Sequence, residues 1–346
     1  MFLHALATAV PPNSLTQAEC WDLIERSPVR QRLSKRSRLI IHSVLRGDHG
    51  IDRRHFAVRQ LDRIFDLTAD ELNAAFRVEA PRLAEQAVIG AMRQAKIDAG
   101  QIDALLICTC SGYLCPGVTS YVAEDLGLRP DAYLQDLVGL GCGAAIPSLR
   151  SASYILAARP GAVVVCVAVE VCSAAFYLDD DFGVLISACL FGDGAAATIW
   201  RGSPGPLGLR AFDFNTLHQP VDRDKLRFEM KEGKLRNLLD RTVPELAAGA
   251  VSKLWGQKGL RPVRSVVSHA GGVDVLSALA EAIPGHSLAA SATVLRSNGN
   301  LSSPSVLFAL EETLKTATPD IDGDFWLVSF GAGFSAHSCR LGVRES

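Results

Sequence analysis

A duplicated order of elements is the feature that most constrains the fold of this chain. A helix, the apolar strand LLIC and the turn at Cys110 follow one another in the first part, and a helix, the strand VRSVV and the turn at His269 repeat that order. The first part also contains the turn GCG around Cys142, followed by a helix and the run VVVCVAVE. The second part repeats this order with the turn GN ending at Asn300, a helix and the run FWLVSFGAG. The offsets agree, since 269 − 110 is 159 and 300 − 142 is 158. The pattern predicts two similar α/β halves, with a chance resemblance between two βαβ segments as the alternative.

The seam between the halves is expected in the turn-rich stretch RGSPGP at residues 201–206. It would divide the chain into an N-terminal half (1–203) that carries the cysteine and a C-terminal half (204–346) that carries the histidine and the asparagine. Short apolar runs such as 163–169 alternate with helical patterns, which indicates buried strands covered by helices. Because pockets favour domain interfaces, we expect a functional site where the halves meet.

Composition and charge exclude several classes of protein. The chain of 346 residues is 48% apolar and 21% charged, which is typical of a globular protein and not of a disordered or fibrous one. A formal net charge of −2 disfavours a nucleic-acid partner. Nine cysteines, an odd number lying partly in apolar runs, indicate reduced thiols and a cytoplasmic location.

Neither a targeting signal nor an integral membrane segment is predicted. The N-terminal run MFLHALATAV lacks a basic region and stops at Pro11, so we expect it to be a first strand. The apolar run at 163–169 is too short to span a bilayer. Between residues 26 and 63 there are eleven Lys or Arg residues against three Asp. This stretch is either a solvated helix face or the approach to a phosphate-bearing ligand.

Three residues carry candidate chemistry. Cys142 precedes a helix, whose positive dipole end is expected to lower the thiol pKa and favour the reactive thiolate. His269 follows a buried-type strand, a position from which an imidazole could activate a facing thiol. Asn300 corresponds to Cys142 in the repeat, and its amide could donate to a developing oxyanion or enolate. Taken singly, a buried structural cysteine, a core histidine and a turn asparagine are the alternatives.

Motifs for metals and nucleotides are weak. The spacing of Cys108, Cys110 and Cys115 lacks a second ligand pair, so no metal is expected there. The consecutive carboxylates at 179–181 are better explained as a solvated loop. Neither a phosphate-binding loop nor a dinucleotide fingerprint occurs in the sequence.

Together these segments resemble those of the type III polyketide synthases, the chalcone-synthase-like ketosynthases. GLGCGAAIPSL, SHAGG and SNGNLSSPSVLFAL occur in the order and spacing of that family, and LFGDGAAA and SFGAG add to the match. The resemblance covers essentially the whole chain. It implies an α/β thiolase fold whose duplicated halves form a five-layered α/β/α/β/α core, in a homodimer.

The resemblance also implies a role for each matching residue. Cys142 would take the starter acyl group from a CoA thioester. His269 and Asn300 would orient malonyl-CoA, promote its decarboxylation and stabilise the enolate. Phe191 matches a gatekeeper aromatic between the CoA tunnel and the substrate cavity. Further residues expected to line that cavity are Cys110, Ser111, Cys172, Ser187 and Ser302.

Departures from the family pattern indicate an altered cavity. Cys110 and Cys172 stand where plant enzymes usually carry Thr, and the second gatekeeper aromatic is replaced by Leu235 or Arg236. The family's CoA-binding basic residues do not align cleanly, which leaves Arg46 as a candidate. We therefore expect a bacterial-type enzyme in which a long-chain acyl starter, giving an alkylpyrone or alkylresorcinol-type product, is favoured over an aromatic one.

Partners and cofactors follow from the same resemblance. Malonyl-CoA and acyl-CoA would be substrates, no cofactor would be permanently bound, and no acyl carrier protein would be obligatory. The Cys115–Pro116 segment would reach into the active site of the second subunit. Two alternatives stay open: a β-ketoacyl-carrier-protein synthase III-like enzyme that performs a single condensation, and a catalytically inactive ligand-binding homologue.

Overall fold

A nine-stranded mixed sheet organises the computed structural model, which describes residues 1–259, 261–316 and 323–343. The strand order is β11-β12-β13-β8-β1-β7-β6-β4-β5. Strand β1 confirms the first strand predicted at the N-terminus. The strands are β1 (Phe2–Ala9), β4 (Ala104–Cys108), β5 (Tyr133–Leu137), β6 (Val164–Glu170), β7 (Gly194–Arg201), β8 (Leu209–His218), β11 (Val263–Ser268), β12 (Asp324–Gly331) and β13 (Ser335–Val343).

The order of strand pairings is the same in the two parts of this sheet. In the first part β4 pairs with β6 in parallel, and β6 with β7 and β7 with β1 are antiparallel. In the second part β11 pairs with β12 in parallel, and β12 with β13 and β13 with β8 are antiparallel. A single residue pair, Phe2 with Arg210, joins β1 to β8. The sheet is therefore two related sheets that touch along one short edge.

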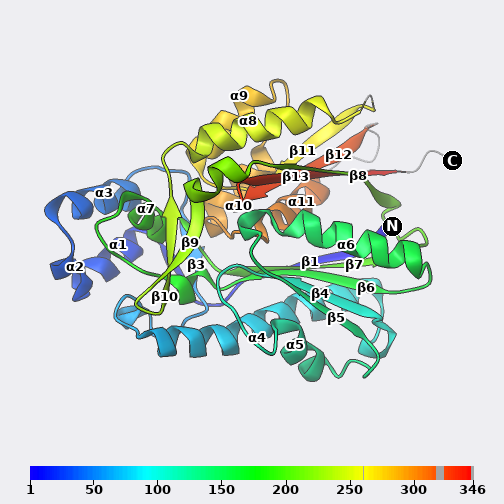
Figure 1. Cartoon of the computed structure of the whole chain (residues 1–346), viewed down its shortest axis with the longest axis horizontal. Helices are drawn as coiled ribbons and strands as arrows, with labels where there is room; N and C mark the ends of the chain where they lie inside the picture. The colour runs from blue at the N-terminus through cyan, green and yellow to red at the C-terminus, as the bar shows by residue number, and fades with distance from the viewer. Residues whose placement is uncertain (260, 317–322, 344–346) are drawn as a thin grey trace.

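Helices fill the space between the two sheets and cover both outer faces (Figure 1). The central helix α6 contacts β4 and β6 on one side and β12 and β13 on the other, and α11 contacts β1, β11 and β12. The result is the sequence of layers α/β/α/β/α. The outer helices are α4 (Ala69–Ala95), α5 (Val118–Leu126), α8 (Val243–Gly256) and α9 (Val273–Ala282), and the inner ones are α6 (Ala145–Ala158), α10 (Ala289–Asn298) and α11 (Ser305–Thr316).

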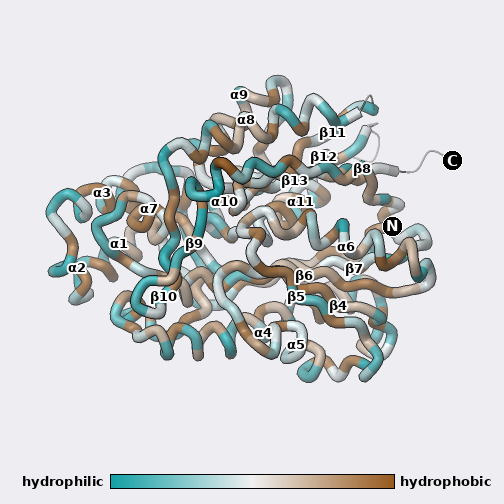
Figure 2. The backbone as a smooth tube through the Cα atoms, in the orientation of Figure 1, coloured by the Kyte–Doolittle hydropathy of each residue, from teal (hydrophilic) through white to brown (hydrophobic). Residues whose placement is uncertain are grey.

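Burial on both faces explains the sequence of the central strands. All seven residues of β6 are buried, because helices cover both sides of the sheet and no face meets water. Figure 2 shows the hydrophobic colour along these strands, whereas the outer helices alternate between the two colours. The run VVCVAV is therefore continuous and not alternating, and it ends in the buried carboxylate of Glu170.

Smaller elements gather beyond one end of the sheets, on the left in Figure 1. The N-terminus of α1 is fixed by a capping box between Thr16 and Glu19. Within the described residues, no helix combines the length and apolarity needed to cross a membrane. The smaller elements at this end of the sheets are β2 (Ser14–Thr16), α1 (Gln17–Arg26), α2 (Val29–Arg32), α3 (Lys35–Arg46), β3 (Arg53–His55), α7 (Phe182–Leu190), β9 (Leu226–Lys231) and β10 (Lys234–Leu239).

Candidate active site

Cys142 lies in the middle layer, in a short 3-10 turn that leads into α6. Gly141 has a φ of 58°, which only glycine adopts without strain. A Cβ on Gly331 would lie 2.8 Å from the Cys142 nitrogen, so that position also has room only for glycine. The Ser302 hydroxyl donates a hydrogen bond of 3.1 Å to the Cys142 sulfur. Backbone from both halves of the chain thus fixes the thiol.

The predicted lowering of the Cys142 pKa is wrong for this structure. Burial raises the pKa of the thiol to about 12, and the nearby carboxylate of Glu170 adds to the rise, although the Ser302 hydrogen bond opposes it. The helix N-terminus contributes only partial charges, and these do not compensate for taking a thiolate out of water. Cys142 is therefore a neutral thiol at neutral pH in the unliganded site.

His269 follows β11 directly, and its side chain is 2% exposed. Its ring packs edge-on against Phe330, with 5.1 Å between centroids. Within the described residues its Nδ1 atom has no hydrogen-bond partner. Burial lowers the pKa of His269 to about 3, so the imidazole is neutral at physiological pH. A neutral imidazole can accept a proton at one ring nitrogen while its other nitrogen carries an N–H donor.

Asn300 is anchored on both sides of its amide. Its Nδ2 donates to the Gly271 carbonyl at 3.0 Å, and its Oδ1 accepts from the Ser302 backbone N–H at 2.8 Å. Its backbone forms an isolated parallel bridge with Phe191. The amide therefore has one fixed orientation beside the histidine loop.

The structure brings the predicted catalytic residues to one cavity. A cavity of about 460 Å³ is lined by Cys142, His269 and Asn300, and also by Phe191. Exposed side chains also line this cavity, and one of them is Arg241. The three candidate residues are thus reachable from the surface through a cavity that Phe191 also lines.

Arg46 is not among the residues that line this cavity. Its guanidinium pairs with Asp22 at 2.5 Å on the surface. Arg241, which the sequence analysis missed, lines the cavity and stacks 4.0 Å from the centroid of the Phe182 ring. Its only sequence signal is its place before the Pro-containing start of α8.

Two further cavities lie near Cys142: Cys142 lines the first, and its neighbour Gly141 lines both. We call the first the reaction cavity. Its lining includes Cys142 and Phe191, and also four residues predicted to line the substrate site: Cys110, Cys172, Ser187 and Ser302. We call the second the side cavity; it has about 700 Å³, and Ser111 lies there and not on the reaction cavity. Both cavities share Cys110, Gly141, Arg227, Phe228 and Ala332, which therefore form their junction.

Glu170 is a functional candidate that the sequence analysis did not single out. Its side chain is fully buried, and one carboxylate oxygen accepts from the backbone N–H groups of Cys110 and Ser111, each at 3.0 Å. The other oxygen accepts from Ser302 at 3.4 Å and from Ser303 at 2.5 Å. The available signal was a lone carboxylate ending an apolar strand, since burying a charge is costly unless a site needs it.

A metal-dependent arrangement is not found in the part of the chain that the structure describes, where no group of three or more His, Cys, Asp or Glu side chains is placed to hold a metal ion. A thiol, a neutral imidazole and an amide on one cavity are the groups that could serve as a nucleophile, a base and a hydrogen-bond donor to a developing oxyanion. The site and the duplicated α/β fold together define an acyltransferase of the thiolase type.

Comparison with known proteins gives the family. Residues 2–204 match the family model described as chalcone and stilbene synthases, N-terminal domain. The chain therefore belongs to the chalcone and stilbene synthase family and is a type III polyketide synthase, which confirms the predicted family and enzyme class.

Its relatives include bacterial enzymes. It is 28% identical to the 1,3,6,8-tetrahydroxynaphthalene synthase of Streptomyces peucetius subsp. caesius, over 97% of this chain and 92% of the relative. It is 27% identical to the 3,5-dihydroxyphenylacetyl-CoA synthase of Amycolatopsis orientalis, over 88% of this chain and 84% of the relative.

Solved structures confirm the predicted thiolase-like fold. The 1,3,6,8-tetrahydroxynaphthalene synthase of Streptomyces coelicolor A3(2) superposes with a TM-score of 0.88 at 24% identity and covers 100% of both chains. A polyketide synthase of the brown alga Ectocarpus siliculosus gives a TM-score of 0.89 at 23% identity, over 99% of this chain and 98% of that one.

Proposed function

We propose that this enzyme condenses malonyl-CoA repeatedly onto an acyl-CoA starter and cyclises the product, with a long-chain acyl starter favoured over an aromatic one. The observation that carries the proposal is the convergence of Cys142, His269 and Asn300 on one cavity that extends to exposed residues. The product class would be an alkylpyrone or an alkylresorcinol. CoA thioesters would be the substrates, with no permanently bound cofactor and no obligatory carrier protein.

Cys142 would be the nucleophile that holds the growing chain. As the substrate thioester binds, His269 would take the thiol proton while the sulfur attacks the carbonyl carbon. The C–S bond to CoA then breaks, and the CoA sulfur leaves with the proton. Because the pKa of His269 is lowered to about 3 by burial, its imidazolium would release that proton readily.

His269 and Asn300 would then act on malonyl-CoA. Loss of CO₂ leaves an enolate, whose charge would lie on the thioester oxygen and be stabilised by the imidazole N–H and the Asn300 amide. The enolate carbon attacks the acyl carbon on Cys142, and the Cys142 sulfur leaves as the new C–C bond forms. The lengthened chain, now on CoA, returns to Cys142 for the next cycle.

The side cavity supports the preference for a long starter. It has about 700 Å³ and shares lining residues with the reaction cavity, among them Gly141, which precedes Cys142. Its apolar lining includes Leu72, Phe76, Val138, Met230 and Leu235. An alkyl chain buried there would gain about 0.8 kcal/mol per CH₂ group.

Mass spectrometry of products from a panel of starters tests this proposal. Malonyl-CoA would be supplied with acetyl-, hexanoyl-, dodecanoyl- and hexadecanoyl-CoA and with an aromatic starter, and also alone. We expect alkylpyrone or alkylresorcinol masses from the long starters and no products from Cys142→Ala. Turnover of only short or aromatic starters would overturn the starter preference. So would formation of a hydroxylated naphthalene, the product in the names of two relatives, in the reaction with malonyl-CoA alone.

A second arm tests the carrier and the number of condensations. Malonyl groups on a carrier protein replace malonyl-CoA in otherwise identical reactions. A single condensation that depends on the carrier would favour the β-ketoacyl synthase alternative. If wild type does not decarboxylate labelled malonyl-CoA, and so equals the Cys142→Ala and His269→Ala variants, the inactive homologue is supported.

A second copy of the chain is the partner we propose. Strand β5 is the edge of the sheet, and an edge strand leaves backbone donors and acceptors free for pairing. Exposed apolar side chains surround it, with Tyr133 51%, Leu134 38% and Val138 51% exposed. Light scattering of the purified protein should give twice the chain mass of 37.0 kDa, and Leu134→Glu should give the monomer. A monomeric wild type would refute the proposal.

A cytoplasmic location is proposed from the thiols. All nine cysteines are free in the structure, including the exposed Cys115. Free thiols persist in reducing compartments. Fractionation of the native host should recover the enzyme with cytosolic markers, and recovery with a secreted fraction would contradict this location.

A further inference from the structure

The hairpin β9–β10 forms a wall of all three cavities. It is a separate two-stranded sheet whose turn, Glu232 and Gly233, has φ values of 53° and 73°. It packs against α7, where Gly183 leaves no room for a Cβ beside the backbone of Leu239. The hairpin residues that line the cavities are Leu226, Arg227, Phe228, Met230, Gly233, Lys234, Leu235, Asn237 and Leu239.

Arg227 is one of the residues that line the junction between the reaction cavity and the side cavity. It lines both of them, and its side chain is 37% exposed. Two carboxylates hold its guanidinium: Glu229 contacts Nη1 at 3.0 Å, and Asp224 contacts Nε at 3.4 Å. An arginine on this path must be held aside if an alkyl chain is to pass, because the chain cannot replace the water around a charged group.

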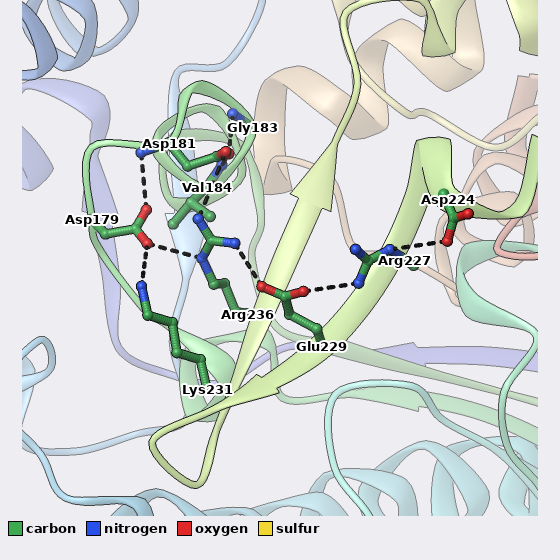
Figure 3. A network of polar contacts seen from close by, with 9 residues as sticks. All are labelled: Asp179, Asp181, Gly183, Val184, Asp224, Arg227, Glu229, Lys231 and Arg236. Carbon is green, nitrogen blue, oxygen red and sulfur yellow. Dashed lines mark hydrogen bonds and ion pairs between the residues drawn. The ribbon is translucent and has the colours of Figure 1, made fainter.

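Arg236 forms an ion pair with Glu229, the carboxylate that also pairs with Arg227. It lies opposite Glu229 in the hairpin register, and its Nη1 contacts Glu229 at 2.7 Å (Figure 3). The two oxygens of Glu229 thus serve one arginine each. Since Arg227 and Glu229 are two residues apart on one strand, they share a face of the hairpin.

Arg236 is also tied to the body of the protein. Its Nε contacts Asp179 at 2.9 Å and its Nη2 lies 3.7 Å from Asp181, in the segment before α7. Asp181 caps α7 through the N–H groups of Gly183 and Val184. The Arg236 side chain is only 13% exposed, so these ion pairs are screened less than surface pairs. Asp179 and Asp181, two of the three carboxylates expected to form a solvated loop, therefore anchor the hairpin.

We propose that Arg236 is a positioning residue that acts through Glu229 to keep Arg227 out of the passage into the side cavity. Arg236 thereby sets the longest chain that the enzyme accepts or builds. The inference rests on the proposed function in one respect, namely that the growing chain enters the side cavity. Without Arg236, Glu229 is no longer fixed to the protein body, and the flexible Arg227 side chain is free to enter the junction.

A double-mutant cycle tests this chain of contacts. Arg236→Met keeps the side-chain length and removes the charge, and Arg227→Ala removes the group said to block the passage. We expect Arg236→Met to lower the ratio of kcat/KM for the longest to the shortest accepted starter by about tenfold, and the double variant to regain most of that ratio. Arg30→Gln, which breaks an exposed pair with Glu25, is the matched control and should leave the ratio unchanged.

The rescue separates positioning from general damage. If Arg236 served only to stabilise the hairpin, Arg236→Met would lower turnover of all starters alike, and removing Arg227 would not restore the ratio. Either result would overturn the inference. A wild type without activity on long starters would refute the starter preference alone. The inference would then be tested on the number of malonyl units in the largest product, which should fall in Arg236→Met and recover in the double variant.

Discussion

Replacing Glu170 with glutamine removes a negative charge beside Cys142 and leaves the shape of the side chain unchanged. One carboxylate oxygen accepts two backbone N–H groups, so the glutamine carbonyl should take that place. The NH₂ group would then face the hydroxyls of Ser302 and Ser303, which can accept. The Ser302 proton, now shared between Glu170 and the Cys142 sulfur, would be left to the sulfur. Both changes favour the Cys142 thiolate.

The size of the effect follows from the geometry. The contacts of 3.1 and 3.4 Å meet at the Ser302 oxygen, so the Cys142 sulfur and the Glu170 oxygen are at most about 6.5 Å apart. Two unit charges at that distance repel by about 2.5 kcal/mol at an effective dielectric constant of 20, and by about 0.6 kcal/mol in water. Glu170→Gln should therefore increase the thiolate population of Cys142 by about 3- to 70-fold.

Alkylation by iodoacetamide measures this population. The rate at Cys142 would be followed by peptide mass spectrometry between pH 7 and pH 10, with the exposed Cys115 as an internal reference. Because the pKa of Cys142 is raised to about 12, the wild-type rate should rise throughout this range, and the variant should be faster at each pH. Ser303→Ala, which keeps the charge and removes one donor, is the control and should show no such gain. A folded Glu170→Gln protein with unchanged or slower alkylation would refute the reasoning.

Three further outcomes are expected. Gly331→Ala should reduce product formation by about 100-fold, because the added Cβ would lie 2.8 Å from the Cys142 nitrogen. Gly161→Ala is the control; its Cβ would have no atom within 4 Å, so activity should be unchanged. Decarboxylation of malonyl-CoA by Cys142→Ala should be flat from pH 5 to pH 8, because the pKa of His269 is lowered to about 3; an acid limb near pH 6.5 would contradict this. Burial raises the pKa of Asp193 to about 6, so the folded state binds a proton where the unfolded state does not. As the pH falls from 7 to 4, wild type should therefore gain up to about 3 kcal/mol of unfolding free energy relative to Asp193→Asn in urea titrations, and parallel curves would refute it.

The sequence predicted the fold and the convergence of the candidate catalytic residues because both depend on the repeat. Once Cys142 and Asn300 are placed at matching positions of two duplicated halves, packing the halves face to face brings these positions to the centre. The repeat also predicts the position of His269, which comes directly after β11, the strand that corresponds to β4. A periodic signal spread over hundreds of residues does not depend on any single side chain.

The residues that escaped prediction are those whose role depends on long-range contacts. Glu170 becomes informative only when Ser302, 132 positions away, is seen to reach it. Arg236 was considered only as one of two residues at the second gatekeeper position, and its ion pair with Asp179, 57 positions away, has no signal in the local sequence. Arg46 was selected because it lies near the family's CoA-binding positions in the sequence, and the structure pairs it with Asp22. Charged side chains are long and flexible, so their partners follow from the completed fold and not from spacing.

The dependence on long-range contacts also explains why the sequence predicted a lowered pKa for Cys142 when burial raises it. The raised pKa bears on how the thiol is activated. A helix N-terminus is visible in a sequence, whereas desolvation depends on what covers the sulfur. With burial raising the pKa of Cys142 to about 12 and lowering that of His269 to about 3, moving a proton from the thiol to the imidazole costs about 12 kcal/mol before the charges attract. Attraction between neighbouring opposite charges offsets about 4 kcal/mol of this. The remainder fits within the barrier of about 17 kcal/mol for one turnover per second, provided that proton transfer and attack on the thioester occur together. The enzyme would therefore hold an unreactive thiol until an acyl-CoA is bound.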